Sequence, residues 1–313
     1  MKKIAFWMSA ILILTTVSCQ EEPQPEIIDD VCVMMDDPVF IEYCYDNFDL
    51  DKDGKISLQE AESVNEIDLS GLNIKSLTGL ENFPNLIKLD CSNKGLSKLD
   101  VNNCKKLEYL KCDGNEITTL LLSNLSNLDT LDCGSNSLTS LIVNNCKELE
   151  YLKCDNNQIT SLDLNGLSKL KILDCKNNRI SLLEVKYTLG LTSLICSDNN
   201  LTALNVSELS NLYLLDCSKN NLTNLDVSYL MNLGTLECSY NEIVDLDINE
   251  CKRLCFLSCR YNKLTTIDLS KMLNIQQFYC IGNPLTLIIL QIRSTILDTD
   301  YTSYPSSIIQ YPQ

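Results

Sequence analysis

The chain contains no histidine among its 313 residues. Catalysis by Ser-His-Asp or Cys-His groups is therefore excluded, as is any zinc site that needs an imidazole ligand. Aromatic residues are scarce at 6%, although hydrophobic residues of all kinds reach 45%. We therefore expect a large core built mainly from aliphatic side chains.

Positive charge is scarce as well, since 25 lysines and arginines stand against 42 aspartates and glutamates, giving a net charge of −17. A field of this sign repels phosphate backbones, which argues against nucleic acid as a partner. It also argues against binding to bare anionic lipid surfaces, while it favours solubility and attracts cations.

Residues 1–18 have the pattern of a secretory signal peptide. Two lysines precede an apolar stretch over residues 4–14, which is too short to cross a membrane. The small Ser18 stands directly before Cys19, and this junction resembles a bacterial lipobox. The resemblance implies that the signal is removed and that Cys19 is lipidated. The alternative is an ordinary signal peptide with a chance cysteine.

Residues 19–36 are acidic, contain two prolines and are interpreted as an extended tether. The acids that closely follow Cys19 resemble the export tags of surface lipoproteins in some Gram-negative bacteria. The resemblance implies an outer-membrane protein that faces outward and contacts the membrane through its lipid anchor only.

A calcium loop is predicted after the tether, within a cap over residues 37–66. Residues 49–60 resemble an EF-hand loop, with acids at the first, third, fifth and twelfth positions and Gly54 at the sharp turn. The ligands implied by the resemblance are the side chains of Asp49, Asp51, Asp53 and Glu60 and the carbonyl of Lys55. Calcium would then be a structural cofactor that orders the cap. The alternative is a degenerate loop kept for its fold.

Helices are predicted on both sides of this loop. Asp37 and Pro38 have the pattern of a helix N-cap and first turn, while Ser57 and Glu60 have that of a capping box. The second helix is expected to run to about Glu66. EF-hands normally occur in pairs, whereas we find one such loop in this sequence.

Ten cysteines recur at one fixed interval of 21 residues. They are Cys91, Cys112, Cys133, Cys154, Cys175, Cys196, Cys217, Cys238, Cys259 and Cys280. Leucine or isoleucine stands five and eight residues after each cysteine, and asparagine stands three residues after nine of them. A 22-residue variant around Ile67 and Leu69 precedes them, so we count eleven repeats.

This pattern, LxxLxCxxNxLxxLxV, resembles the leucine-rich repeat, and its short period resembles the bacterial IRREKO class of that family. The resemblance covers residues 64–290. It implies an α/β-type repeat solenoid, an arc with one parallel strand ladder behind the short EF-hand-like cap. A single repeat cannot bury its inward apolar residues alone, so stacked neighbours are expected to share one core. The asparagines are expected to bond backbone groups that would otherwise be buried unsatisfied.

The cysteine row is interpreted as packed thiols that replace an inward leucine. Neighbouring rungs would hold their Cβ vectors parallel, which disfavours disulfides, and a single file of thiols does not converge on a metal. Cys104, Cys146 and Cys251 are interpreted as core residues as well. Cys32 and Cys44, near the calcium loop, form a separate candidate pair.

The repeat pattern breaks after Leu290. Residues 291–313 are predicted to cap the open end, with contributions from Tyr301, Tyr304 and Pro305.

In leucine-rich repeats the strand residues beside the inward leucine face the concave side, where partners bind. The binding residues predicted there are Tyr109, Lys111, Tyr151, Lys153, Leu214, Phe256 and Tyr279. Aspartate and lysine alternate one residue before the first four cysteines of the row, from Asp90 to Lys153. The segment LEYLKCD stands at residues 107–113 and again at 149–155, and a duplication of two repeats explains this alternation without any function. Apolar residues on a wet face indicate contact with a partner, although scattered exposed apolar residues are also ordinary.

The sequence therefore predicts a non-catalytic surface lipoprotein whose concave face binds a protein of a host or of the bacterial surface. The alternative is a glycan-binding surface lipoprotein with Tyr109, Tyr151, Tyr240 and Tyr261 as stacking platforms. An enzyme is not expected. Asp132 and Asp174 are the pair closest to a glycosidase arrangement, but they stand in a column expected to be solvated, with nothing to raise either pKa.

Overall fold

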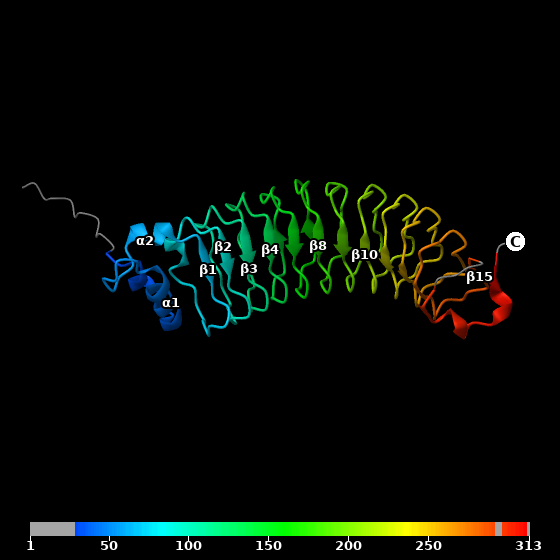
Figure 1. Cartoon of the computed structure of the whole chain (residues 1–313), viewed down its shortest axis with the longest axis horizontal. Helices are drawn as coiled ribbons and strands as arrows, with labels where there is room; N and C mark the ends of the chain where they lie inside the picture. Colours follow the sequence, from blue (N-terminus) through cyan, green and yellow to red (C-terminus); the bar gives the residue numbers. More distant parts are fainter. Residues whose placement is uncertain (1–28, 292–295, 312–313) are drawn as a thin grey trace, which may run out of the picture.

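The computed structural model describes residues 29–291 and 296–311. In this part of the chain the backbone winds into an elongated stack of short turns, with helices at the N-terminal end and the C-terminus at the far end (Figure 1). The signal peptide, Cys19 and the first half of the tether lie outside the described residues.

Helix α1 (Pro38–Phe48) packs its apolar face against the start of the stack. The Asp37 carboxylate accepts hydrogen bonds from the first backbone N–H groups of this helix, as the sequence predicts for an N-cap. The ring centroids of Phe40 and Phe48 lie 6.5 and 5.6 Å from that of Phe83. These aromatic contacts tie the cap to the repeats.

Helix α2 (Leu58–Ser63) begins at the predicted capping box, in which Ser57 and Glu60 satisfy each other's backbone N–H groups. The helix is shorter than predicted. It does not reach Glu66, because Glu66 already belongs to the first strand of the sheet.

Four short 3-10 turns complete the helical structure of the described residues. They are η1 (Val31–Met34), η2 (Leu80–Asn82), η3 (Tyr301–Ser303) and η4 (Ser306–Ile308). A search of the described residues for a helix with the length and apolar character to cross a membrane finds none.

Twelve short strands form one parallel sheet along the stack. In order they are β1 (Glu66–Asp68), β2 (Lys88–Asp90), β3 (Tyr109–Lys111), β4 (Thr130–Asp132), β6 (Tyr151–Lys153), β8 (Ile172–Asp174), β9 (Ser193–Ile195), β10 (Leu214–Asp216), β11 (Thr235–Glu237), β12 (Phe256–Ser258), β14 (Gln277–Tyr279) and β16 (Asp298–Thr299). Glu66 pairs with Lys88, an offset of 22 residues, and the later strands pair at an offset of 21, as Lys88 does with Tyr109. The predicted repeat solenoid with a parallel strand ladder is confirmed.

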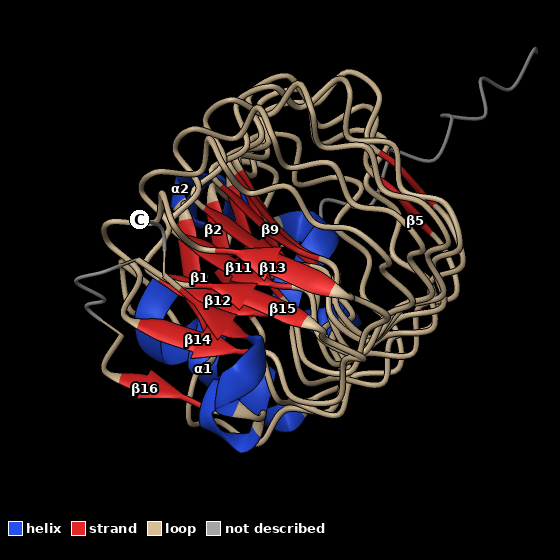
Figure 2. Ribbon diagram, turned by 90° about the vertical axis from the view of Figure 1, so that its right-hand side faces the viewer, coloured by secondary structure: helices blue, strands red, loops and turns tan. Residues whose placement is uncertain are grey.

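Two smaller parallel sheets lie elsewhere on the turns. One contains β5 (Leu141–Ile142) and β7 (Leu162–Asp163), and the other contains β13 (Thr266–Asp268), β15 (Leu287–Ile289) and β17 (Ile309–Gln310). Seen along the stack, the turns form a ring, with β2 and its neighbours on one side and β5 on the other (Figure 2).

The long sheet has one rung more than the eleven repeats counted in the sequence. β16 pairs with β14 at the same 21-residue offset, although its inward residue is Thr299 rather than leucine. The Tyr304 hydroxyl then stands where the next asparagine would be. It accepts from the Asn283 N–H and donates to the Cys280 carbonyl, both at 3.1 Å. A tyrosine therefore ends the asparagine ladder.

The ten cysteines of the row directly follow the strands and are 0% exposed. They are free thiols. Cys104, Cys146 and Cys251 are also 0% exposed, so the interpretation of these cysteines as packed core residues is confirmed.

The asparagine ladder bonds the backbone of two turns at once. The Asn178 amide donates to the carbonyls of Cys154 and Cys175 at 3.0 and 3.1 Å, and its Oδ1 accepts from the Ile159 N–H at 2.9 Å. Equivalent bonds recur from Asn115 to Asn283. The expected role of these asparagines is confirmed, and it explains how turns with few strand residues remain fully bonded.

Candidate functional site

The outward side chains of the long sheet form the candidate site, called here the sheet face. In each three-residue strand the first and third residues stand on this face, and the middle residue is buried. The seven predicted binding residues all lie there and are half-buried. They are Tyr109 and Lys111 on β3, Tyr151 and Lys153 on β6, Leu214 on β10, Phe256 on β12 and Tyr279 on β14.

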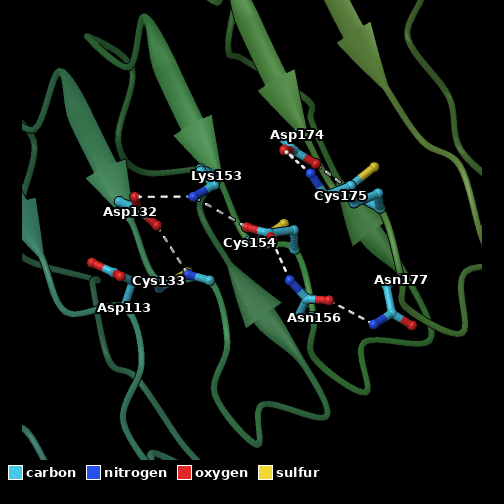
Figure 3. Close-up of polar contacts among 12 residues, drawn as sticks. Asp113, Asp132, Cys133, Lys153, Cys154, Asn156, Asp174, Cys175 and Asn177 are labelled. Carbon is cyan, nitrogen blue, oxygen red and sulfur yellow. Dashed lines mark hydrogen bonds and ion pairs between the residues drawn. The ribbon is translucent and has the colours of Figure 1, made fainter. Parts of the chain in front are cut away.

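The N-terminal half of the sheet face carries ordered charges. Lys153 Nζ lies 3.5 Å from the Asp132 carboxylate and 3.6 Å from that of Asp155 (Figure 3). Two turns earlier, Lys111 Nζ lies 3.6 Å from the Asp90 carboxylate, so the grouping repeats with the duplicated segment. Ion pairs at a surface contribute at most about 1 kcal/mol to stability. These ion pairs therefore add little to the stability of the fold.

Two carboxylates on the sheet face are less solvated than the sequence suggests. The side chains of Asp132 and Asp174 keep 13% and 9% of their exposure, and burial raises the pKa of both. The expectation that nothing raises either pKa is wrong, because side chains of adjacent strands, about 4.8 Å away, cover each carboxylate. Each still has a lysine partner: Lys153 for Asp132, and Lys176 at 3.3 Å for Asp174. Such pairing suits an ion-pair network rather than a proton donor.

The C-terminal half of the sheet face, from β9 to β16, mixes apolar and polar side chains, and its aromatic residues are Phe256 and Tyr279. The rings of Phe256 and Tyr279 pack with their centroids 5.9 Å apart. The Arg260 guanidinium lies 4.2 Å from the centroid of the Tyr279 ring, in a cation–π contact. Leu214 stands two strands away from Phe256, on β10. This half therefore offers a surface with aromatic anchors and one cation.

Sequence reasoning missed two acids beside these aromatic residues. Arg260 Nε donates to the Asp300 carboxylate at 2.7 Å, and the Tyr279 hydroxyl donates to Asp298. Both acids follow the point where the cysteine pattern ends. Counting a further 21 residues from Tyr279 would have found Asp300 on the next rung.

Tyr240 and Tyr261 form a second aromatic feature, in the turns that follow the strands. Their rings are stacked, with centroids 4.6 Å apart, and the residues are 51% and 48% exposed. Both have positive φ, 58° and 52°, which is unfavourable for a bulky side chain. The stack offsets part of this strain. The structure does not bring Tyr109 or Tyr151 to this stack, because those residues lie on β3 and β6.

The predicted calcium loop lies between α1 and α2. One carboxylate oxygen from each of Asp49, Asp51 and Asp53 lies within 4.8 Å of the other two. Asp49 Oδ1 is buried and has no hydrogen-bond partner, while its Oδ2 accepts from the Gly54 N–H at 3.0 Å. A buried acceptor without a donor fits a hard cation, which would supply the missing interaction.

The other two predicted ligands are engaged differently. Glu60 Oε1 accepts from the Leu50 N–H at 2.8 Å, and Oε2 accepts from the Ser57 hydroxyl at 2.8 Å. The Lys55 N–H donates to Asp53 Oδ1 at 2.9 Å, and its ammonium pairs with Asp29. Glu60 therefore closes the loop against α2, and it is not part of the three-aspartate cluster.

Comparison with known protein families finds no matching family profile, and comparison with curated proteins finds no matching sequence. Comparison with solved structures finds leucine-rich-repeat proteins, among them internalins of Listeria monocytogenes. The fold of this chain is a leucine-rich-repeat solenoid of the kind found in bacteria.

The functional domain of InlJ from Listeria monocytogenes is similar to this chain, with 27% identity and a TM-score of 0.69 over 90% of this chain and 70% of that chain. That domain is described as including a cysteine ladder. YopM from Yersinia enterocolitica shares the fold at 24% identity and a TM-score of 0.62, over 75% of this chain and 50% of that chain.

The ectodomain of the receptor kinase GASSHO1/SCHENGEN3 from Arabidopsis thaliana also shares the fold, with 24% identity and a TM-score of 0.57. The match covers 82% of this chain and 31% of that chain, which was solved in complex with CASPARIAN STRIP INTEGRITY FACTOR 2.

Proposed function

We propose that this chain is a non-catalytic protein-binding module that acts through its sheet face. The observation that carries the proposal is that the sheet face combines paired charges, such as Lys153 with Asp132, with a cluster of Phe256, Tyr279 and Arg260 near its C-terminal end. Aromatic residues and arginine on a rigid surface are the usual anchors of protein interfaces, while ordered charges select the partner.

The test first crosslinks the purified full chain to the protein that it binds. That binding protein is then identified and purified. Phe256→Ala is expected to weaken its binding at least tenfold, because the substitution removes an aromatic anchor that packs against Tyr279 on the sheet face. Tyr229→Ala is the matched control, since Tyr229 is 65% exposed and lies outside the sheet face. Equal losses for both variants, measured by calorimetry, would place the binding surface elsewhere.

The proposal extends to display on the outer membrane through lipidated Cys19. Its support is the junction of Ser18 and Cys19 and the acids behind it. Protease added to intact cells is expected to remove the protein rapidly, and Cys19→Ala is expected to release it from the membrane fraction. A protein that survives shaving of intact cells, yet is cleaved after lysis, would lie on an inner leaflet.

A glycan partner is the second candidate, favoured by the exposed stack of Tyr240 and Tyr261. Tyrosine rings offer apolar faces and edges on which sugar rings pack. A glycan array probed with the full chain, and with Tyr240→Asn, separates the two candidates. Asparagine suits the positive φ at this position, so the variant is expected to keep the fold and to lose any glycan signal.

We also propose that the cap holds one structural calcium ion on the side chains of Asp49, Asp51, Asp53 and Glu60 and the carbonyl of Lys55. The ion would offset two of the four carboxylate charges and order the loop. Calorimetric titration is expected to give a Kd of roughly 10⁻⁴ to 10⁻³ M, like other extracellular modules. Asp49→Asn is expected to weaken binding at least tenfold, and Asp46→Asn, an exposed acid on α1, is expected to leave it unchanged. Absence of heat at millimolar calcium would end this proposal.

A further inference from the structure

Two groups of charged residues repeat on the sheet face, two rungs apart. Each group combines a lysine of one strand, the aspartate at the same position of the preceding strand, and the aspartate two residues after the lysine. The first group, called here triad 1, contains Asp90, Lys111 and Asp113. The second, triad 2, contains Asp132, Lys153 and Asp155 (Figure 3). Each triad holds two carboxylates and one ammonium, so each keeps an excess of negative charge.

The lysines of the triads hold their aspartates loosely. The four distances from lysine Nζ to carboxylate oxygen lie between 3.5 and 3.8 Å. Hydrogen bonds between such groups are shorter, at about 2.7 to 3.2 Å. Each lysine therefore offsets one charge of its triad without giving the carboxylate oxygens a well-placed donor.

One oxygen in each triad has no hydrogen-bond donor. Oδ1 of Asp113 and Oδ1 of Asp155 are buried and have no hydrogen-bond partner. The Asp155 side chain is only 5% exposed, and its Oδ1 lies 3.6 Å from Lys153 Nζ, inside triad 2. The missing side chain of Gly134 gives this oxygen its room, since a Cβ there would collide with it. A buried acceptor without a donor is costly, and a cationic donor from a partner would relieve that cost.

A tyrosine stands beside the lysine of each triad. Tyr109 begins β3, which ends at Lys111, and Tyr151 begins β6, which ends at Lys153. Residues two apart in a strand stand on the same face of the sheet. The ammonium of Lys88 lies 5.7 Å from the centroid of the Tyr109 ring, so this ring is presented to cations. Carboxylates and a tyrosine ring together form the surroundings that a guanidinium prefers.

We infer that the two triads bind an extended basic segment of a partner protein, with one arginine on each triad. The inference rests on the proposed protein-binding function of the sheet face and names the chemistry of its partner. Arginine fits better than lysine, because its planar guanidinium donates to two carboxylate oxygens at once. The triad lysines, 34% and 30% exposed on flexible stems, turn into solvent as the guanidinium takes their place. The net charge of −17 draws a basic segment toward this chain.

The spacing of the triads sets the spacing of the arginines. Two rungs of a parallel sheet span about 10 Å. A polyproline II segment has three residues per turn and rises about 3.1 Å per residue, so every third residue stands on one side, about 9.3 Å from the last. The triads therefore match two arginines that are separated by two residues. The series ends there, because Ile195 and Ser197 stand where a third triad would have its lysine and second aspartate.

The probe for the test is a labelled peptide of eight residues, all proline except for arginine at its third and sixth positions. Fluorescence anisotropy with the full chain is expected to show binding that weakens as salt is added. A peptide with the two arginines adjacent is expected to bind about threefold more weakly, since it reaches one triad only. Equal binding of the two arginine peptides would overturn the inference. So would absence of binding at millimolar peptide, or binding of a peptide with glutamate in place of both arginines.

Three variants locate the bound peptide. Asp155→Asn keeps the shape of the side chain, removes its charge and is expected to weaken binding about tenfold. Asp163→Asn makes the same change at an exposed acid of β7, outside the sheet face, and is expected to change affinity by less than about twofold. Lys111→Met removes the competing cation of triad 1 and is expected to tighten binding about threefold, a gain that a merely structural triad would not give. Circular dichroism checks that each variant is folded.

Equal effects of the two aspartate substitutions, or no gain from Lys111→Met, would overturn the inference. The protein-binding proposal is tested separately, by the captured partner. A partner that loses affinity with Phe256→Ala but binds Asp155→Asn unchanged would leave the protein-binding module in place and exclude the basic segment.

Discussion

Raising the pH is expected to unfold this protein abruptly between about pH 9 and 10, even with reductant present. All ten thiols of the cysteine row have a pKa raised by burial, since the charged form cannot be solvated in the core. In the unfolded chain the same thiols ionise with a pKa of about 8.5. The folded state then binds more protons than the unfolded state, so stability falls as pH rises.

The size of the effect comes from the number of thiols. Stability is complete below about pH 8, and each row thiol then loses about 0.8 kcal/mol by pH 9 and about 1.4 kcal/mol by pH 9.5. Ten thiols together lose about 8 and about 14 kcal/mol, which spans the usual stability of a folded domain. Cys104, Cys146 and Cys251 add to the loss, because burial raises their pKa to about 12, 11 and 11.

Circular dichroism against pH, combined with urea unfolding at each pH, measures this loss. Replacing Cys112, Cys154, Cys196 and Cys238 by alanine is expected to reduce the slope of unfolding free energy against pH by about three tenths, since these are four of the thirteen buried thiols just described. The comparison uses slopes, so a lower starting stability of the variant does not matter. An unchanged slope would mean that the row thiols are not the groups that titrate.

Asn178→Ala is expected to lower the free energy of unfolding by about 2 to 4 kcal/mol. The substitution leaves the N–H of Ile159 without its partner. The carbonyls of Cys154 and Cys175 each lose one of two amide donors and keep the other, from Asn157 and Asn199 respectively. Asn178 is only 9% exposed, so water does not replace these bonds. Each unsatisfied buried group costs about 1 to 3 kcal/mol. Chemical denaturation followed by circular dichroism measures the change.

Asn124→Ala is the matched control. Asn124 is the same residue type in the same turn architecture, but its amide makes one exposed bond to the Asn102 carbonyl at 3.5 Å. A change within about 0.5 kcal/mol is expected there. Similar losses at the two positions would mean that the buried ladder adds nothing beyond an ordinary asparagine contact.

The fold was predictable because every rung repeats one local pattern. A period of 21 residues, with a buried residue in the middle of each strand, fixes the parallel register without knowledge of distant contacts. The last rung escaped this reasoning, because Thr299 and Tyr304 replace the apolar residue and the asparagine while the backbone keeps the same offset. The end of α2 escaped it as well, since the pairing of Glu66 with Lys88 in the sheet overrides the helix signal.

The face on which the candidate-site residues lie was predictable from the sequence, but the burial of their side chains was not. Strand alternation puts Tyr151, Lys153 and Phe256 on one face. The burial of Asp132 and Asp174 depends on side chains from adjacent turns, which a single repeat does not reveal.

Because the register is constant, the gene can gain or lose whole repeats. From Cys91 to Cys259, each cysteine N–H of the row bonds a carbonyl of the next rung at the same offset, as Cys133 does with Lys153 and Cys154 with Asp174. Unequal recombination that deletes or duplicates whole 21-residue units therefore joins turns whose hydrogen-bonding groups already match. The identical segments 107–113 and 149–155 provide a site for such exchange, two turns apart. The length of the sheet face can thus change by whole rungs without a change in its register.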